Sequence, residues 1–559
     1  MNLVLIVVEL KKVTEHREII EICGKCGDCG TTGTQISTAK RHIDQPCVVK
    51  NVLGFEAYDA RGRILVLKNL LEGNISLDDS IVKWAYTCTT CGSCKETCLA
   101  IEGGIDTPLL MESLREDLVR LGYKMEKHGE LAKSIQEYQN PYNEPKEERL
   151  QFLKIDPEHV NTEGEIHLYI GCTSSYREQQ IAQATIDLFE LLGIDFFILK
   201  NEDCCGSILK RQGYIRQFDS IVKKNIETIR ETGAKKMVFP CAGCYRTFKQ
   251  DYSLDGMEHK SGKLKLYHLV EFLDEYLAEN PYQFKFKRHQ KITYHDPCHL
   301  GRHSGVYEAP RNLLRMIENA TFVEMTTSRN YGHCCGAGGG VKSSNNDLAI
   351  SVANNRWDEV LDRQATILVS ACPFCEKNFK DALPDGQNGL RVLDISEILL
   401  ETAVRTLSSQ VITNNKNESL TIGKRYMNFL SEYPEIFSDL TENSIMDFTI
   451  YESIDDLEDE LVPHDAFNVK RTADGIKIVH GRADDPDLEL ALSIGAVKKL
   501  VNTTTKEEYA TLFGSFYNEP DEDEGWIDFV LHKRTKSLIK MGYGKFAESA
   551  GILEDENQV

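Results

Sequence analysis

Ten cysteines between residues 172 and 375 form one spacing pattern that occurs twice. The two copies are Cys172, Cys204-Cys205, Cys241 and Cys244, and Cys298, Cys334-Cys335, Cys372 and Cys375. In the first copy 31 and 35 residues separate these landmarks, and in the second 35 and 36. This regularity predicts an internal duplication, with one structural unit around each set. Five cysteines exceed the four ligands of a zinc site, whereas an iron–sulfur centre with several irons can use all five.

The residues around these cysteines carry a family resemblance. Both copies resemble the cysteine-rich CCG modules of the heterodisulfide reductase catalytic subunit, a family that also includes iron–sulfur subunits of glycolate and lactate oxidases. The matching words are YHDPCH (residues 294–299), CCGAGGG (334–340) and CPFC (372–375), and the resemblance covers about residues 1–400. It implies that each module holds a noncubane 4Fe–4S cluster on its five cysteines. It also implies that the two clusters face one substrate pocket, so that all ten cysteines are catalytic.

Eight further cysteines precede the modules and have ferredoxin spacing. From Cys88 the chain reads C-x2-C-x2-C-x3-C, a run in which the fourth cysteine serves the other of two clusters. Two departures occur: Leu99 replaces the usual proline, and 17 residues separate Cys29 from Cys47. By the crossover rule we expect two cubane 4Fe–4S clusters, one on Cys23, Cys26, Cys29 and Cys98, the other on Cys88, Cys91, Cys94 and Cys47. The alternative is a zinc knuckle with a structural thiol.

Composition and charge argue against a nucleic-acid-binding protein, a membrane-spanning protein and a disulfide-bonded protein. The 559-residue chain has a formal charge of −22, which would repel the phosphates of a nucleic acid. The early apolar run Leu3–Val8 is too short to cross a bilayer and follows no basic segment, so we expect no direct membrane span. Without a secretory signal, the clustered cysteines favour metal ligation over disulfides. We therefore expect a cytoplasmic protein that reaches a membrane only through a partner.

The predicted fold class is multidomain: an all-α dicluster ferredoxin domain, two α/β CCG modules and a C-terminal α+β domain. The expected boundaries are 1–125 for the ferredoxin domain, 126–160 for a linker, 161–275 and 290–402 for the modules, and 425–559 for the last domain. Helices are expected over residues 9–22, 60–71, 109–121, 181–192 and 348–361. Short apolar strands are expected over 166–170, 237–239, 292–294 and 367–369. Alternation of strands with helices favours parallel sheets, whose carboxyl ends would present the cysteines.

After about Thr402 the chain contains no cysteine. A polar stretch, Asn414–Asn417, indicates a linker. Strands are then expected over 447–451, 475–479, 488–492 and 526–531, with a helix from Ile494. The stretch Ala483–Leu492 weakly resembles the sterol-carrier fold, and a docking module fits this region equally well.

Disulfide reduction takes two electrons, whereas an iron–sulfur cluster normally handles one. Two adjacent clusters that each bind one substrate sulfur would resolve this mismatch, with the two cubanes as suppliers of electrons. A second group of residues has two alternative roles. His295, His299, His303 and His333 either protonate a departing thiolate or hydrogen-bond loops and cluster sulfurs. Arg177, Lys210, Arg211 and Arg302 either hold an anionic substrate or lie on a solvated surface.

The leading hypothesis is a disulfide reductase subunit of the heterodisulfide type, acting on a small thiol or disulfide. The glycine run at Gly336–Gly340 does not complete a dinucleotide motif, so the chain needs an electron-donating partner. This partner would be a flavoprotein, a hydrogenase or formate dehydrogenase-type subunit, or a cytochrome b subunit. One alternative is an electron-transfer subunit of a flavoprotein dehydrogenase, such as a glycolate or lactate oxidase, without its own substrate site. Another is a scaffold protein whose clusters are structural.

Overall fold

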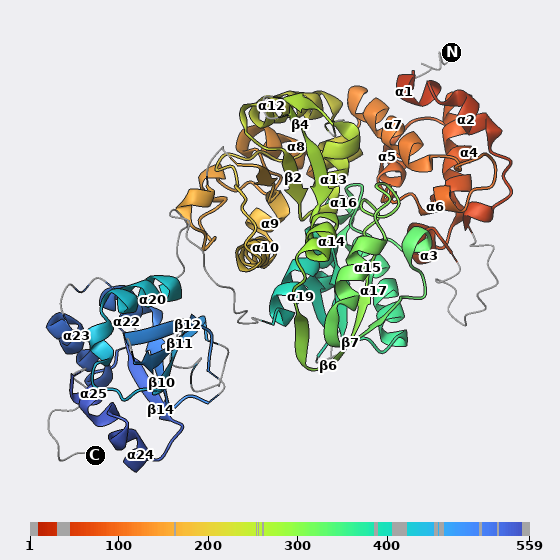
Figure 1. Cartoon of the computed structure of the whole chain (residues 1–559). Coiled ribbons are helices and arrows are strands. Elements are labelled where there is room, and N and C mark those ends of the chain that lie inside the picture. The colour runs from red at the N-terminus through yellow and green to blue at the C-terminus, as the bar shows by residue number, and fades with distance from the viewer. Residues whose placement is uncertain are drawn as a thin grey trace. The chain divides into compact units, whose positions relative to one another are not determined.

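The computed structural model describes residues 9–30, 45–160, 164–384, 389–404 and 422–549, without 253, 255, 260–261, 452–456, 458–462, 474, 484, 502, 504–505 and 522–524. The chain divides into two compact units, Met1–Val404 and Arg405–Val559 (Figure 1). The expected features at Leu3–Val8 and Asn414–Asn417 fall outside the described residues. All eighteen cysteines belong to the described part of the first unit and are free thiols.

Helices make up the beginning of the first unit. They are α1 (Lys11–Thr14), α2 (Arg17–Ile22), α3 (Val48–Leu53), α4 (Ala60–Leu71), α5 (Asp79–Ala85), α6 (Ser93–Glu96), α7 (Thr107–Arg120) and α8 (Glu126–Tyr138). The helices expected over 60–71 and 109–121 are confirmed as α4 and α7, whose first turns are capped by the Asp59 and Asp106 carboxylates. The helix expected over 9–22 is instead two short helices. The first ends where the Thr14 hydroxyl donates to the Leu10 carbonyl at 2.6 Å.

The segment expected to be a linker, residues 126–160, is largely packed structure. Helix α8 buries His128 and Ile135 and contacts α16 (Val341–Ser344) of the second module. Further on, buried Arg149 forms an ion pair with buried Glu202. A linker was expected from the polar composition of the segment, but His128, Ala132 and Ile135 lie on one face of α8 and are buried.

The first module contains a parallel sheet of order β1-β2-β5. Its strands are β1 (Ile166–Leu168), β2 (Lys236–Phe239) and β5 (Lys265–His268), preceded by a small antiparallel pair, β3 (Glu258–His259) and β4 (Gly262–Lys263). Its helices are α9 (Cys172–Tyr176), α10 (Gln179–Leu191), α11 (Ser207–Gln212), α12 (Ile215–Glu231), α13 (Ala242–Arg246) and α14 (Leu269–Glu279). A parallel bridge from Phe197 to His167 extends the β1 edge.

The second module repeats this arrangement in a parallel sheet of order β7-β6-β8-β9. Its strands are β6 (Phe284–Tyr294), β7 (Ile317–Val323), β8 (Ile367–Ser370) and β9 (Arg391–Asp394). Its helices are α15 (Glu308–Arg315), α16, α17 (Asn346–Asp362), α18 (Pro373–Asp381) and α19 (Ile395–Thr402). The expected strands and parallel pairing are confirmed, but the boundary at residue 290 is too late because β6 begins at Phe284.

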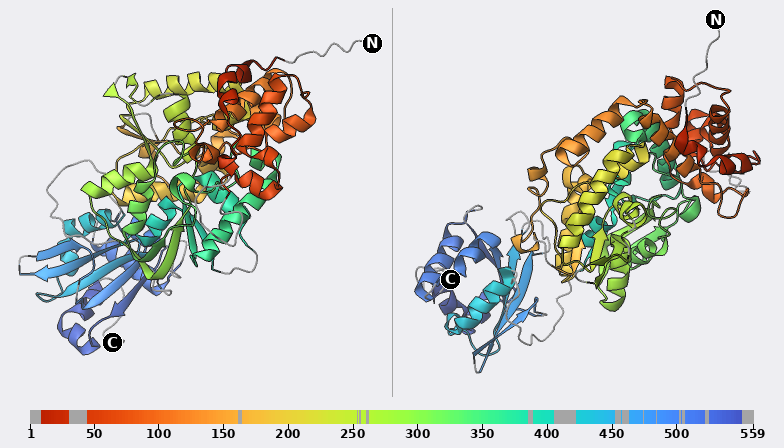
Figure 2. Two further views of the ribbon diagram at one scale, coloured as in Figure 1. Left: turned by 90° about the vertical axis from the view of Figure 1, so that its right-hand side faces the viewer. Right: turned by 90° about the horizontal axis from the view of Figure 1, so that it is seen from above.

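One hydrophobic core runs through both modules, and a second core lies among the N-terminal helices. Ile186, Phe239, Ile292 and Val369 are fully or almost fully buried in the shared core. Both views of Figure 2 show the N-terminal helices, in red and orange, beside the green and teal segments of the modules. The cysteine loops of the three parts are therefore positioned by one continuous body, the first unit.

The second unit is a five-stranded sheet of order β12-β11-β10-β13-β14 with helices. Its strands are β10 (Ile445–Tyr451), β11 (Asp465–Thr472), β12 (Gly475–His480), β13 (Leu488–Ser493) and β14 (Ile527–Leu531), and its helices are α20 (Ile422–Glu432), α22 (Ile494–Leu500), α23 (Lys506–Asn518), α24 (Thr535–Lys540) and α25 (Tyr543–Ser549). Among the strands described in this unit, only β10 and β13 pair in parallel. Four strands were expected, and β11 was missed. The sterol-carrier likeness remains a prediction.

Candidate iron–sulfur site

In both modules, cysteines lie just beyond the carboxyl ends of neighbouring parallel strands. Cys241 follows β2 and caps α13, and Cys372 follows β8 and caps α18. Cys172 begins α9 just beyond β1, and Cys298 follows β6. The carboxyl ends of adjacent parallel strands meet at one edge, which brings these thiols together.

The vicinal pairs have the same backbone geometry in both modules. Gly206 has φ +75° and Gly336 has φ +94°, and each donates its N–H to the sulfur of the first cysteine of its pair, Cys204 or Cys334, at 3.4 Å. A side chain at Gly336 would also meet Val352, whose Cβ would lie 2.7 Å away. Left-handed backbone and close packing explain why glycine follows each pair.

A cavity of about 280 Å³ lies between the two modules. Nine module cysteines line it: Cys172, Cys204, Cys205, Cys241, Cys244, Cys298, Cys335, Cys372 and Cys375. The Cys241 and Cys372 thiols interact across the two modules. Interaction first with Cys244 and then with Cys372 lowers the pKa of Cys241, and interaction with Cys241 raises the pKa of Cys372. The two predicted sites therefore open into one space.

Two smaller cavities lie among the N-terminal helices. One is lined by Cys47, Cys88, Cys91 and Cys94, and the other by Cys23, Cys26, Cys29, Cys98 and also Cys94. The structure thus places Cys47 with the second cysteine run, despite the long spacing that separates it from Cys29. Burial raises the pKa of Cys29 to about 11 and that of Cys47 to about 12. Because the thiolate is the ligand, metal binding there would release protons.

The cysteine run that begins at Cys88 lies against the second module. The Cys91 and Cys334 side chains lie close enough to interact, and this interaction lowers the pKa of Cys91. Arg302 donates from Nε to the Cys91 carbonyl at 2.8 Å, and a ring nitrogen of His303 lies 3.0 Å from the Thr90 carbonyl. Cys334, the one module cysteine that does not line the large cavity, is therefore directed toward the N-terminal helices.

Buried Arg115, which the sequence analysis did not single out, joins three parts of the unit. Its guanidinium donates to the Arg211 carbonyl at 2.8 Å, the Gly339 carbonyl at 3.0 Å and the Cys88 carbonyl at 2.5 Å. These carbonyls belong to the first module, the second module and the ferredoxin-like run. An arginine at a buried helical position among apolar residues was the available signal.

The four histidines that crowd the second module in sequence have different surroundings. His333 bonds Glu359 at 3.1 Å, and His303 contacts Thr90 as described. His295 lies beside Cys335 and Cys375. His299 lines the large cavity, and its buried Nε2 has no hydrogen-bond partner among the described residues. Burial, followed by the charge of Arg246, lowers the pKa of His299.

Of the four basic residues considered, only Arg211 lines the large cavity. It is already paired with Glu112 at 2.7 Å and with Asp251. Arg177 forms an ion pair with Glu144 and lies over the ring of Tyr142. Arg302 donates its hydrogen bonds to backbone carbonyls. Lys342, which the sequence analysis missed, also lines the cavity and pairs with Asp381 at 2.8 Å.

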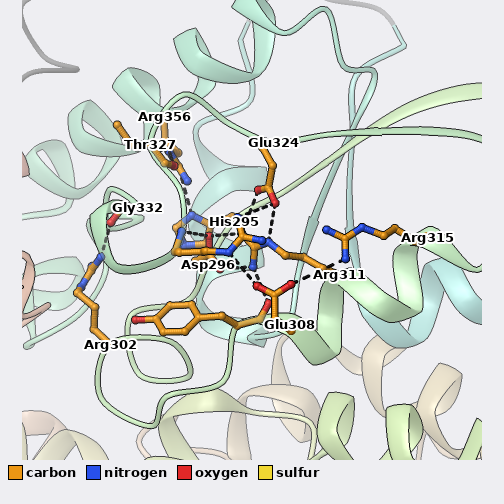
Figure 3. Close-up of polar contacts among 12 residues, drawn as sticks. His295, Asp296, Arg302, Glu308, Arg311, Arg315, Glu324, Thr327, Gly332 and Arg356 are labelled. Atoms are coloured by element: carbon orange, nitrogen blue, oxygen red, sulfur yellow. Dashed lines mark hydrogen bonds and ion pairs between the residues drawn. The ribbon is translucent and has the colours of Figure 1, made fainter. Parts of the chain in front are cut away.

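A buried ion pair between Asp296 and Arg311 stabilises the loop that carries Cys298. Asp296 accepts two hydrogen bonds from Arg311, at 2.8 and 2.9 Å (Figure 3). It accepts a third from the Arg329 N–H at 2.8 Å. Arg311 also pairs with Glu324. The bidentate geometry fixes the direction of the chain between β6 and Cys298.

These arrangements suit iron–sulfur clusters, because each cavity collects four or more soft thiol donors and few hard ones. Comparison with known proteins gives a family. The model of the CCG cysteine-rich domain matches residues 166–249 and 292–380. The D subunit of dihydromethanophenazine:CoB–CoM heterodisulfide reductase from Methanosarcina acetivorans is 39% identical over 325 residues, which are 57% of this chain and 77% of that protein. The chain belongs to the family of this heterodisulfide reductase D subunit.

More distant relatives of this heterodisulfide reductase family member have other names. The B subunit of fumarate reductase (CoM/CoB) from Methanothermobacter marburgensis is 30% identical, over 56% of this chain and 60% of that protein. EtfAB:quinone oxidoreductase of Syntrophomonas wolfei is 29% identical, over 59% of this chain and 48% of that protein. The predicted resemblance is confirmed, and kinship supports iron–sulfur clusters and an oxidoreductase role. Within the described ranges, no helix is long and apolar enough to cross a bilayer.

Proposed function

We propose that this chain is the catalytic subunit of a disulfide reductase of the heterodisulfide type. The observation that carries the proposal is the single cavity of about 280 Å³ lined by cysteines of both modules. Because the two proposed clusters would occupy part of this space, what remains could admit only a small molecule and not a macromolecule. In the overall reaction the S–S bond breaks, and two electrons and two protons convert the disulfide into two thiols.

The eighteen cysteines would hold four 4Fe–4S clusters, two cubane and two noncubane. When bound, these clusters supply electrons singly, so that two adjacent ones meet the two-electron requirement of the reaction. The proposed ligands are the four sets described above, with Cys47 in the set that begins at Cys88. The thiol donors that line each cavity support this assignment.

The packing of the sites suggests a direction for electron flow. Cys94 lines both N-terminal cavities, Cys91 contacts Cys334, and Cys241 contacts Cys372. Electrons from a partner protein would therefore enter at the set containing Cys26, which is exposed, and pass through the second module to the first. The partner would be an electron-donating flavoprotein, a hydrogenase or formate dehydrogenase-type subunit, or a cytochrome b subunit.

His299 is the histidine best placed to serve the substrate. It lines the cavity, is buried, and keeps Nε2 free of a hydrogen-bond partner in the described structure. Its lowered pKa favours the neutral ring, whose one N–H can donate to a substrate sulfur. Arg211 and Lys342 place positive charge in the lining of the cavity, and their ion pairs with Glu112 and Asp381 partly neutralise it.

A second candidate function is electron relay for a flavoprotein, without a substrate site on this chain. The likeness to EtfAB:quinone oxidoreductase favours it. The two functions make different demands on the large cavity: relay needs only the spacing of the clusters, whereas reduction needs access for a disulfide.

The test is the release of thiols from small heterodisulfides, with reduced viologen as electron donor, by wild type and by the Cys205→Ser and Cys335→Ser variants. Each substitution removes one vicinal thiol and offers iron a harder oxygen instead. We expect turnover in wild type and its collapse in both variants, because both modules face the substrate. If wild type reduces no disulfide but passes electrons to a flavoprotein, the relay function replaces this proposal.

A further inference from the structure

The two modules differ at one matched position beside their cysteines. Tyr169 precedes Cys172 by three residues, and His295 precedes Cys298 by three. Both backbone N–H groups donate at 2.9 Å to equivalent carbonyls, Tyr169 to Val238 and His295 to Val369. Val238 and Val369 in turn each lie three residues before a cysteine. The two side chains therefore occupy the same place in the duplicated fold.

Arginine fixes the tautomer of His295. Arg356 donates from Nε to His295 Nδ1 at 3.4 Å, and its Nη1 donates to the Thr327 carbonyl and hydroxyl at 2.8 and 2.6 Å (Figure 3). A guanidinium can only donate, so Nδ1 must accept. In a neutral ring the proton then resides on Nε2. Glu359, 2.8 Å from Arg356, holds the guanidinium in place.

The ring of His295 lies beside two of the proposed cluster ligands. A ring nitrogen of His295 and the sulfurs of Cys335 and Cys375 lie within 4.8 Å of one another. Nε2 is buried without a hydrogen-bond partner in the described part of the chain, and Phe379 packs edge-on against the ring at 4.8 Å between centroids. Because Arg356 donates to Nδ1, Nε2 carries the ring proton and is the nitrogen free to donate.

The first module offers no comparable donor at this position. The Tyr169 hydroxyl donates to the Asp203 carbonyl at 2.5 Å, which uses its only proton. The tyrosine is as buried as His295 and lies among the same kinds of neighbours, since the charges of Cys205 and Cys244 act on it. The duplicated sites thus have similar thiol sets but different hydrogen-bond donors beside them.

We infer that His295 is a positioning residue that donates an Nε2 hydrogen bond to the Cys335–Cys375 side of the second module's cluster and makes that cluster easier to reduce than its twin. Hydrogen bonds to cluster sulfurs raise the reduction potential, because they stabilise the extra negative charge of the reduced state. The inference rests on the proposed function, in that each module must bind a cluster. It makes the second module, which adjoins Cys91, the first acceptor of the pair.

The test is a redox titration followed by electron paramagnetic resonance on wild type and on the His295→Leu, His295→Gln and Tyr169→Phe variants, with iron measured in each. Leucine has no donor, whereas glutamine places an N–H near the position of Nε2. We expect His295→Leu to lower the midpoint potential of one of the two module clusters, with iron content unchanged. His295→Gln should restore most of the shift, and Tyr169→Phe should leave that cluster unaffected.

Three outcomes would overturn the inference. The first is an unchanged potential in His295→Leu at full iron content, and the second is a glutamine variant that behaves like the leucine variant. The third is loss of one cluster's iron in both His295 variants, since the histidine would then be a ligand and not a donor. Absence of module clusters from wild type would instead refute the proposed function on which the inference rests.

Discussion

His128 shows how one buried side chain makes the stability of the first unit depend on pH. It is fully buried in α8, and its Nε2 donates to the Gly340 carbonyl at 2.9 Å. Burial lowers its pKa from 6.5 to about 4. The folded state therefore disfavours the charged ring, so its contribution to stability is present above pH 6.5 and is lost as the pH falls through 4.

We expect the His128→Gln variant to lose less stability than wild type as the pH falls from 6.5 to 4. Glutamine can keep the bond to Gly340 but takes up no proton. The difference from wild type at the acid end should approach about 3 kcal/mol, since each pKa unit corresponds to about 1.4 kcal/mol. The measurement is the melting temperature against pH under anaerobic conditions. The exposed His289 provides a control, because His289→Gln should melt like wild type throughout. Parallel curves for His128→Gln and wild type would contradict the account.

At the scale of elements, the glycine run before α16 explains how the N-terminal helices meet the second module. A Cβ on Gly339 would lie 2.5 Å from the Cys88 carbonyl, and one on Gly338 would lie 2.7 Å from the Thr89 carbonyl. Gly339 also has φ +62°. The backbone of this turn thus packs directly on the loop that carries Cys88, where side chains cannot fit.

We expect Gly339→Ala to destabilise the first unit and to perturb the site of Cys88. Its matched control is Gly305→Ala: Gly305 has φ +79°, but nothing lies within 4 Å of its added Cβ. The control should cost about 1 kcal/mol for left-handed strain alone, whereas Gly339→Ala adds a clash with backbone. Melting temperature and iron content would be compared. Equal effects of the two substitutions would show that the close approach is unimportant.

Sequence predicted the elements whose patterns are local and failed where burial depends on distant partners. The strands before Cys172, Cys241, Cys298 and Cys372 were predicted because short apolar runs end at each cysteine. Helix α8 was missed because its contacts, such as His128 with Gly340, join residues 212 positions apart. Strand β11 was also missed, although Phe467 and Val469 alternate with Asn468 and Lys470 as in a half-buried strand. The shared cavity was implied by family resemblance, whereas the partners of Arg115 and Lys342 are distant in sequence and became known only from the structure.

At the scale of the whole molecule, all the cysteines belong to the first unit and none to the second. All eighteen cysteines precede residue 405, and the sheet of the second unit has its own core, with Phe448 stacked on Phe467. Val404 ends the first unit, where its N–H donates to the Gln283 carbonyl at 2.8 Å. Nothing in the proposed electron path uses residues beyond this point.

We expect a chain that ends at Val404 to keep its iron and its spectra. A chain that ends at Leu390 is the control. It lacks β9, which pairs with β8, and the whole of α19, which contacts β6 and α10, so the edge of the second module should fail. Loss of all clusters on truncation after Val404 would show that the second unit is needed for folding of the first.

The most direct test of the central claim is the content of iron and acid-labile sulfide in anaerobically purified full-length protein. Four 4Fe–4S clusters require about sixteen irons and about sixteen sulfides per chain. Cys205→Ser and Cys335→Ser should each lose about four irons, from different modules, while the signals of the N-terminal sites persist. Stoichiometric zinc with little iron, or full iron in both variants, would contradict the assignment of the eighteen cysteines to four iron–sulfur sites.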